Sequence, residues 1–179
     1  IDRPTNALTR DADGDDHYRA VARVGRDAAD ALHYAHERGV LHRDINPNNI
    51  VLADGRATFI DFGLAKSVDE TRTQLTATGG VLGTLDYLPP EVIGGHEHSA
   101  GSDIYQLGLV LYESLTGQCP VSAPELLAYS TGGTIAPPPP PSKLVAGIPE
   151  ALDELVLQAI AVSPAERLSS ARVFHEGLS

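Results

Sequence analysis

The sequence predicts a mainly helical α+β domain with one small β-hairpin. Two long segments, at about 17–38 and 102–115, repeat apolar residues at the spacing of a helix that covers a core. Strand-like runs are limited to 50–52 and 57–60, and a tight-turn sequence separates them. The length of 179 residues and the hydrophobic fraction of 42% allow one domain with its own core, and they exclude a wholly disordered chain.

The first predicted helix follows a polar lead-in at residues 1–16 and spans about 17–38. Its apolar residues are Val21, Val24, Ala28, Ala31, Leu32 and Ala35. Gly39 follows the last of them, and glycine is the residue that commonly ends a helix. The two short runs come next, joined by Ala53-Asp54-Gly55-Arg56, in which Gly55 suits the left-handed position of a hairpin turn. We therefore expect a helix and then an antiparallel hairpin.

The rest of the chain is predicted to be a long loop followed by helices. A threonine-rich polar stretch runs from Ser67 to about Thr84, and connections of that length are usually functional. The helix at 102–115 follows, with Asp103 expected as its N-terminal cap and Gly117 at its end. Shorter helices are predicted at 124–129, 150–162 and 169–177. Five consecutive prolines, Pro137–Pro141, are expected to form polyproline II, either as a stiff spacer or as a ligand for an aromatic groove.

The chemistry-bearing residues lie on both sides of the predicted hairpin. His42-Arg43-Asp44-Ile45-Asn46-Pro47-Asn48-Asn49 precedes it, and Asp61-Phe62-Gly63 follows it. Because antiparallel pairing returns the chain, we expect Asn49 and Asp61 to face a common point. Their oxygen atoms suit Mg²⁺, a hard cation that binds carboxylates together with substrate phosphates. Asp44 is then left to accept a proton from an attacking hydroxyl, so the sequence indicates phosphoryl transfer.

These segments resemble those of protein kinases. Residues 42–49 are similar to the kinase catalytic loop, and Asp61-Phe62-Gly63 is similar to the motif that follows it. Gly83-Thr84-Leu85-Asp86-Tyr87-Leu88-Pro89-Pro90-Glu91 looks like the end of an activation segment, which would span 61–91. Asp103 and Arg167 stand where the family has a buried helix aspartate and a late arginine. The likeness covers about 17–178 and is strongest to the bacterial branch of eukaryotic-like Ser/Thr kinases.

The resemblance implies a fold, a reaction and catalytic residues. The fold would be a kinase C-terminal lobe at 17–179, with a proline-rich insert at 136–142. The reaction would transfer the γ-phosphate of ATP to Ser/Thr hydroxyls of protein substrates, with Mg²⁺ as the metal. Asn49 and Asp61 would hold the metal on the nucleotide. Asp44 would orient and deprotonate the hydroxyl, and Thr84 would contact Asp44.

The resemblance also implies regulatory and structural roles. Arg43 would pair with a phosphorylated residue of the activation segment, although each candidate could equally be a solvated spacer. The candidates are Thr71, Thr73, Thr76 and Thr78. Glu91 and Arg167 would form a buried ion pair. Asp103 would be a structural anchor and not a catalytic residue. His42 is interpreted as a structural residue, and His96 with His98 as an exposed loop and not as a pair of metal ligands.

Asn46 departs from the kinase pattern, which normally has a lysine two residues beyond the catalytic aspartate, where it touches the γ-phosphate. Asparagine keeps a hydrogen-bond donor but loses the charge, and charge-assisted hydrogen bonds are about twice as strong as neutral ones. We therefore expect slower transfer and a gain from Asn46→Lys. The alternative is a pseudokinase or scaffold lobe that binds proteins without transferring phosphate.

The nucleotide-covering parts of a kinase do not match any residue of this chain. Its two lysines are Lys66 and Lys143, neither of which precedes the catalytic loop, and no Gly-x-Gly-x-x-Gly occurs. The chain also starts at Ile1 and contains no methionine. We expect a fragment that lacks the N-terminal lobe, is inactive alone and depends on that lobe in cis.

Charge and cysteine content give expectations about partners and compartment. There are 24 acidic and 13 basic residues, and this excess of negative charge argues against nucleic acid as a partner. No apolar stretch approaches the ~20 residues that span a bilayer. The single cysteine, Cys119, cannot form an internal disulfide, which favours the cytoplasm. A parent protein could still be anchored by a segment outside this chain.

Overall fold

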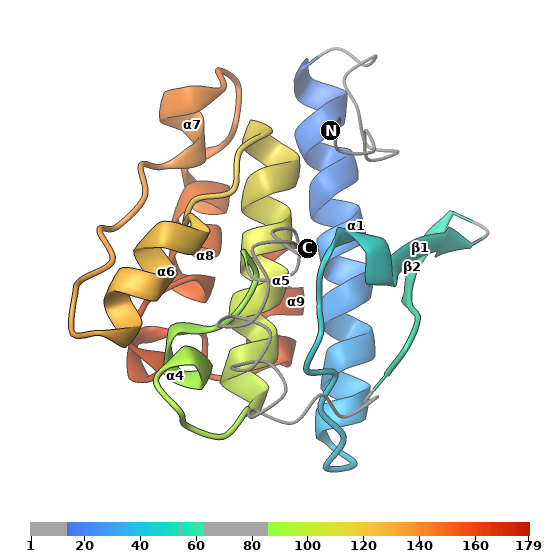
Figure 1. Ribbon diagram of the computed structural model, residues 1–179. Coiled ribbons are helices and arrows are strands. Elements are labelled where there is room, and N and C mark those ends of the chain that lie inside the picture. The colour runs from blue at the N-terminus through green and yellow to red at the C-terminus, as the bar shows by residue number, and fades with distance from the viewer. Residues whose placement is uncertain (1–13, 54, 63–85) are drawn as a thin grey trace.

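The computed structural model describes residues 14–53, 55–62 and 86–179, and this part of the chain is mainly helical, as predicted (Figure 1). The elements in chain order are α1 (Gly14–His36), η1 (Pro47–Asn49), β1 (Ile50–Ala53), β2 (Arg56–Phe59), α4 (Pro90–Ile93), α5 (Ala100–Thr116), α6 (Ala123–Ser130), α7 (Pro141–Leu144), α8 (Glu150–Ala159), η2 (Pro164–Glu166) and α9 (Ala171–Gly177). No helix in these ranges is long and apolar enough to cross a membrane.

Helix α5 forms the centre of the molecule, with α1 on one side and α8 on the other (Figure 1). Every residue from 102 to 112 is buried, so this helix is covered all round instead of along one stripe. The predicted end is confirmed, because Gly117 adopts a left-handed conformation with φ 76° and its N–H donates to the carbonyl of Glu113. The main core cluster therefore surrounds α5, and a smaller cluster joins Ile93 of α4 to Leu126 of α6.

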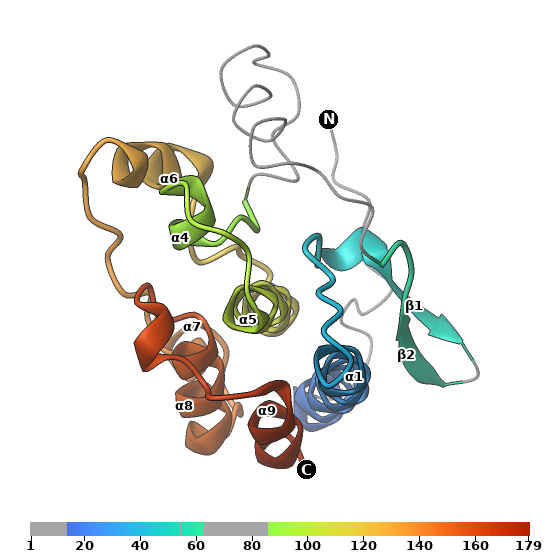
Figure 2. The same cartoon turned by 90° about the horizontal axis from the view of Figure 1, so that it is seen from below.

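Helix α1 packs against α5 and α9 with part of its surface and against the hairpin strand β2 with another part. It begins at Gly14, before the expected start at 17, and it ends at His36. Its buried residues, such as Ala28 and Leu32, belong to the core around α5, and α9 packs against the same helix. Figure 2 shows the hairpin on another side of α1, away from α5. The predicted helical stripe is thus confirmed.

Strands β1 and β2 form the predicted antiparallel hairpin, with Ile50 opposite Phe59 and Ala53 opposite Arg56. Gly55 has φ 77°, the left-handed turn conformation that the sequence predicts. Ala57 and Phe59 are buried, and β2 is the strand that packs on α1. Alternate residues of β2 are exposed, as expected for a strand with one face on a core.

The run of five prolines is non-helical except at its last residue. Pro140 has φ −55° and ψ 137°, close to polyproline II, but Pro141 is the first residue of α7. The expectation that all five prolines are non-helical is therefore wrong at Pro141, because proline is well suited to the first position of a helix. The hydroxyl of Tyr112 donates to the carbonyl of Pro139 at 2.9 Å and holds the segment against α5.

Candidate active site

The loop between α1 and the hairpin is fixed by a buried carboxylate from α5. Asp103 has no exposed surface, and it accepts the backbone N–H groups of His42 and Arg43, each at 2.9 Å. His36 and His98 contact the same carboxylate through Nε2, at 2.8 and 3.0 Å. Burial alone would raise the pKa of Asp103, but these hydrogen bonds outweigh it and hold the pKa well below its usual range.

Two expectations about this region are corrected. Asp103 is not the N-terminal cap of α5, because the helix begins at Ala100 and Ser99 occupies the cap position. The N–H of Ser99 donates to the hydroxyl of Ser102 at 3.0 Å, so the helix end is satisfied without Asp103. His98 is not part of an exposed loop, since its ring is mostly buried against Asp103. Asp103 is thus an anchor for the loop and not a cap.

His42 is a structural residue, as expected. It is 1% exposed, and its ring lies 4.7 Å from that of Phe59 and 4.6 Å from that of Phe62. Burial lowers the pKa of its imidazole despite the nearby carboxylates Asp103 and Asp44. A neutral ring is therefore expected at pH 7, and it packs under the loop beside the segment that carries Asp61.

Asp44 and Asn49 are in direct contact. The side-chain amide of Asn49 donates to the backbone carbonyl of Asp44 at 2.7 Å and to its Oδ2 at 3.2 Å. The turn η1 brings them together, because its short path returns Asn49 beneath Asp44. Asp44 is half-buried, so its carboxylate is held on the protein side and still reachable from solvent.

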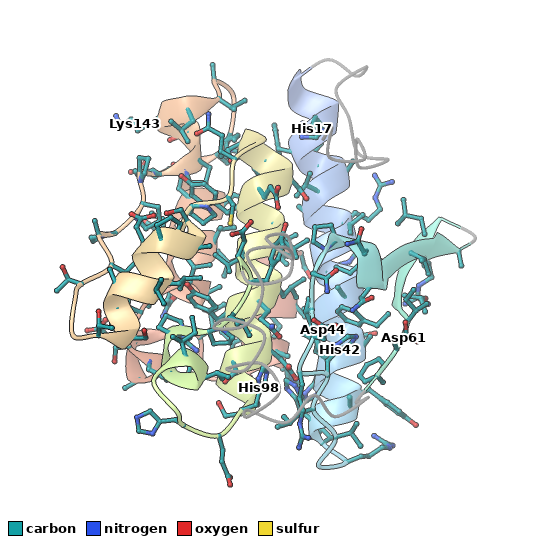
Figure 3. All side chains as sticks on the ribbon, viewed as in Figure 1. His17, His42, Asp44, Asp61, His98 and Lys143 are labelled. Carbon is teal, nitrogen blue, oxygen red and sulfur yellow. The ribbon has the colours of Figure 1, made fainter. Side chains whose placement is uncertain are left out.

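Asp61 reaches the same region through the hairpin. The N–H of Ile60 donates to the carbonyl of Asn49 at 3.0 Å, so Asp61 follows directly after a residue bonded to Asn49. Its φ of 60° is left-handed, as is that of Arg43 at 68°, and non-glycine residues rarely adopt this strained conformation. Figure 3 shows Asp44 and His42 beside α1 and Asp61 on the chain leaving β2. No bond joins the Asp61 side chain to Asp44 or Asn49 within the described ranges.

The donor atoms in this region fit a magnesium ion. Asn49 uses its amide nitrogen on Asp44, which leaves its Oδ1 available, and the carboxylate of Asp61 is exposed. Among the described residues no group of three or more His, Cys, Asp or Glu could hold a metal. An amide oxygen and one carboxylate nevertheless suit Mg²⁺, which takes few protein ligands and completes its shell with phosphates and water.

Glu91 and Arg167 form the expected buried ion pair. The two guanidinium nitrogens of Arg167 donate to the two carboxylate oxygens of Glu91 at 2.8 and 2.7 Å. Burial favours the neutral acid, but the hydrogen bonds from Arg167 and Ser102 outweigh it, and the pKa of Glu91 lies below its usual value. Arg167 also stacks over the ring of Tyr105 at 4.6 Å, so the pair ties α4 and η2 to α5.

The remaining predicted residues are placed as follows. Arg43 has an exposed side chain, while its backbone is held by Asp103. Asn46 is buried beside Asp44. Thr71, Thr73, Thr76, Thr78 and Thr84 lie outside the described residues. Lys143 is on α7, at the top left of Figure 3 and away from Asp44, which lies near the centre of that view.

The sequence analysis did not identify three further residues that hold the loop, either directly or through Asp103. His36 and His98 flank Asp103, and the side-chain oxygen of Gln106 accepts the N–H of Ile45 at 3.3 Å. Gln106 lies one turn after Asp103 on the same helix, and that spacing is the signal that could have found it. His98 offers no such signal, because its place depends on the path of the loop before α5.

Comparison with known proteins gives a consistent family. The profile of the protein kinase domain matches residues 12–178. The chain is similar to the serine/threonine-protein kinase PknB of Mycolicibacterium smegmatis, with 38% identity over 154 residues, 86% of this chain and 25% of that protein. Pkn1 of Myxococcus xanthus is also 38% identical, over 89% of this chain and 24% of its own length. The chain thus spans about a quarter of these relatives.

A solved structure shows the same arrangement of elements. The crystal structure of the Mycobacterium tuberculosis PknI kinase domain superposes with a TM-score of 0.65 and 29% sequence identity. The match covers 90% of this chain and 54% of that one. The described fold therefore corresponds to about half of that kinase domain.

Proposed function

The chain belongs to the protein kinase domain family, and on that premise we propose that it supplies the catalytic-loop lobe of an ATP-dependent Ser/Thr protein kinase. The names of the relatives support the Ser/Thr class. The acceptor would be a hydroxyl of a protein substrate. Because its single cysteine, Cys119, cannot form an internal disulfide, we also propose that this lobe works in the cytoplasm.

The observation that carries the proposal is the contact between Asp44 and Asn49, next to the residue that precedes Asp61. Two hydrogen bonds from the Asn49 amide fix Asp44, and the Ile60–Asn49 backbone bond holds the residue before Asp61 next to Asn49. In the proposed reaction the substrate oxygen bonds to the γ-phosphorus, the bond to the bridging oxygen breaks, and ADP leaves. Asp44 accepts the hydroxyl proton, which needs its carboxylate held but open to solvent.

Asn49 and Asp61 would hold the magnesium ion. Bound there on the nucleotide phosphates, Mg²⁺ would neutralise the charge that the transferring group carries. Asn49 would then serve twice, because its amide nitrogen orients Asp44 while its Oδ1 faces the metal. Asp61 would supply the single carboxylate that such a site requires.

Further residues are proposed to control and complete the site. Arg43 would bind a phosphorylated threonine of the activation segment, through charge-assisted hydrogen bonds from its exposed guanidinium. Thr84 would contact Asp44 when substrate binds. We propose that the N-terminal lobe acts in cis and supplies the glycine-rich loop and lysine over the phosphates, so the 179-residue chain alone transfers no phosphate.

The test measures phosphate transfer from labelled ATP by the whole protein. We expect Asp44→Asn to lower the rate at least about 100-fold, because the base is removed. Asp61→Asn should lower the rate and raise the Mg²⁺ concentration needed for half-maximal activity. Asp30→Asn makes the same change at an exposed position of α1 and should have no effect. Equal incorporation by the wild type and Asp44→Asn would refute the proposal.

The alternative function is a protein-binding lobe without phosphate transfer. The observation that favours it is Asn46, which stands where kinases carry a phosphate-contacting lysine. In that case neither the wild type nor Asp44→Asn incorporates label, while the protein still binds its partner. Loss of incorporation in Asp44→Asn alone rejects this alternative.

A further inference from the structure

Asn46 is a buried polar residue next to the proposed catalytic base. Asn46 is 6% exposed, and its Oδ1 accepts the backbone N–H of Asn48 at 3.0 Å. This bond caps the turn η1, a common use of asparagine at the start of a helical turn. Because the carbonyl end of the side chain faces Asn48, the amide nitrogen must face the other way, toward Asp44.

Among the described residues, the amide nitrogen of Asn46 bonds only to Asp44. It lies 3.2 Å from the backbone carbonyl oxygen of Asp44 and 3.3 Å from its Oδ1. Asn49 donates to the same backbone oxygen and to Oδ2. Each carboxylate oxygen of Asp44 is therefore held by a different asparagine, and the pair of amides fixes the direction in which the carboxylate points.

This geometry leaves Asn46 no donor for a phosphate. A side-chain amide has two N–H groups, and both are directed at oxygens of Asp44. Its side chain also reaches less far than a lysine's, by about two atoms. A contact with the γ-phosphate would break the bonds to Asp44 and leave buried polar groups unpaired.

Resting on the proposed kinase function, we propose that Asn46 is a positioning residue that aims the Asp44 carboxylate at the substrate hydroxyl and makes no contact with the phosphate. The site then lacks the positive charge of the usual lysine, and Asn46 and Asn49 together orient the Asp44 carboxylate. Small errors in the direction of a catalytic base are costly because proton transfer requires hydrogen-bond geometry. The loss of the lysine and the presence of an intact Asp44 are thus compatible.

The first test separates positioning from nucleotide binding. Serine keeps the cap on Asn48 but has no amide nitrogen, so Asn46→Ser removes the contacts with the backbone carbonyl and Oδ1 of Asp44 and leaves the cap in place. In the whole protein we expect kcat to fall about tenfold, while KM for ATP and the Kd for Mg·ATP stay within about twofold. If Asn46 contacted the phosphate, its replacement by serine would instead raise the KM for ATP and the Kd for Mg·ATP.

The second test uses lysine. Asn46→Lys removes both the cap and the contact with Asp44, so we expect kcat to fall, the reverse of the gain expected from the sequence pattern alone. Asn48→Ser is the matched control, because Asn48 is exposed and contributes only its backbone N–H to Asn46. A higher kcat in Asn46→Lys, or weaker Mg·ATP binding in Asn46→Ser, overturns the positioning role.

A structural readout keeps this inference separate from the proposed function. In a crystal structure of Asn46→Ser, the Asp44 carboxylate should rotate away from its wild-type direction while η1 keeps its backbone. An unchanged carboxylate overturns the positioning role even in an active kinase. An inactive wild type with a rotated carboxylate in the variant would instead refute the kinase assignment and leave the contact between Asn46 and Asp44 demonstrated.

Discussion

At the scale of single residues, Asp103 fixes the position of the loop between α1 and the hairpin. One carboxylate accepts two backbone N–H groups from the loop and contacts two histidines from different segments. Arg43, whose N–H is bound by Asp103, has a left-handed backbone. Such a strained conformation persists only where the surrounding bonds hold it in place. The same bonds that lower the pKa of Asp103 therefore hold the residue before Asp44 in its unusual conformation.

The ion pair between Glu91 and Arg167 gives a prediction about stability. Arg167 is 4% exposed, so Glu91→Gln leaves a buried guanidinium without its charge partner. We expect the free energy of unfolding at pH 7 to fall by about 3–5 kcal/mol. Chemical unfolding measures the change, and Glu176→Gln in the exposed Arg172–Glu176 pair should cost at most ~1 kcal/mol.

The same pair makes stability depend on acidity. Because the pKa of Glu91 is lowered in the folded state, its contribution is complete above the unfolded-state value of ~4.3 and is lost as the pH falls through the folded-state value. The wild type should therefore lose stability in acid more steeply than Glu91→Gln. Asp103, whose pKa is also lowered, keeps some acid dependence in the variant. Parallel acid profiles for the two proteins would contradict the assigned role of Glu91.

At the scale of elements, a glycine sets how closely α5 and α8 pack. A Cβ on Gly108 would lie 2.7 Å from Cγ2 of Ile160 and 2.9 Å from Cβ of Ala159. Ala159 cannot move aside without its backbone, so Gly108→Ala must push the helices apart. We expect a loss of about 1–3 kcal/mol in chemical unfolding, although alanine favours the helix itself by ~1 kcal/mol.

The control for this prediction lies on the same helix. Gly101→Ala meets only the hydroxyl of Ser99, at 3.5 Å, so it should be neutral or slightly stabilising. If Gly101→Ala and Gly108→Ala change the unfolding free energy equally, helix propensity and not the close approach of α5 to α8 determines the effect.

The elements were more predictable than the contacts between them. The hairpin and both long helices follow from local signals, such as Gly55 at the turn and Gly117 at the helix end. The approach of Asn49 to Asp44 was also foreseeable, because η1 and the hairpin return the chain over a few residues. The family resemblance indicated a buried structural Asp103, but its bonds to the loop and the place of His98 were not foreseeable, because they depend on contacts between α5 and segments distant in sequence.

Asn46 shows where sequence patterns fail at the site itself. The pattern says only which residue type is replaced, whereas the bonds of Asn46 to Asp44 and Asn48 determine what the new residue does. A loop position with two donors and one acceptor can take several partners. Its choice is therefore fixed by backbone geometry that no spacing rule describes.

At the scale of the whole molecule, the hairpin and the residues that follow it expose several large apolar side chains. Val51 and Leu52 on β1 are 37% and 52% exposed, and Ile60 and Phe62 beyond β2 are each 39% exposed. They lie on the hairpin and the chain that leaves it, on the outer side of α1 (Figure 2). In the proposed function this surface is covered by the other lobe, and without that cover it favours association.

The prediction at this scale concerns the 179-residue chain by itself. Within the described residues the sheet contains only β1 and β2, so the hairpin has a strand edge without a partner there, beside exposed apolar side chains. Such an edge is a template for pairing with another copy. We expect concentration-dependent association in sedimentation velocity, and we expect Leu52→Lys to reduce it because a charge on β1 must be desolvated in any such contact. Leu127→Lys on α6, where the side chain is 55% exposed, should leave association unchanged. Equal effects of the two lysines would mean that general solubility, and not the hairpin surface, controls association.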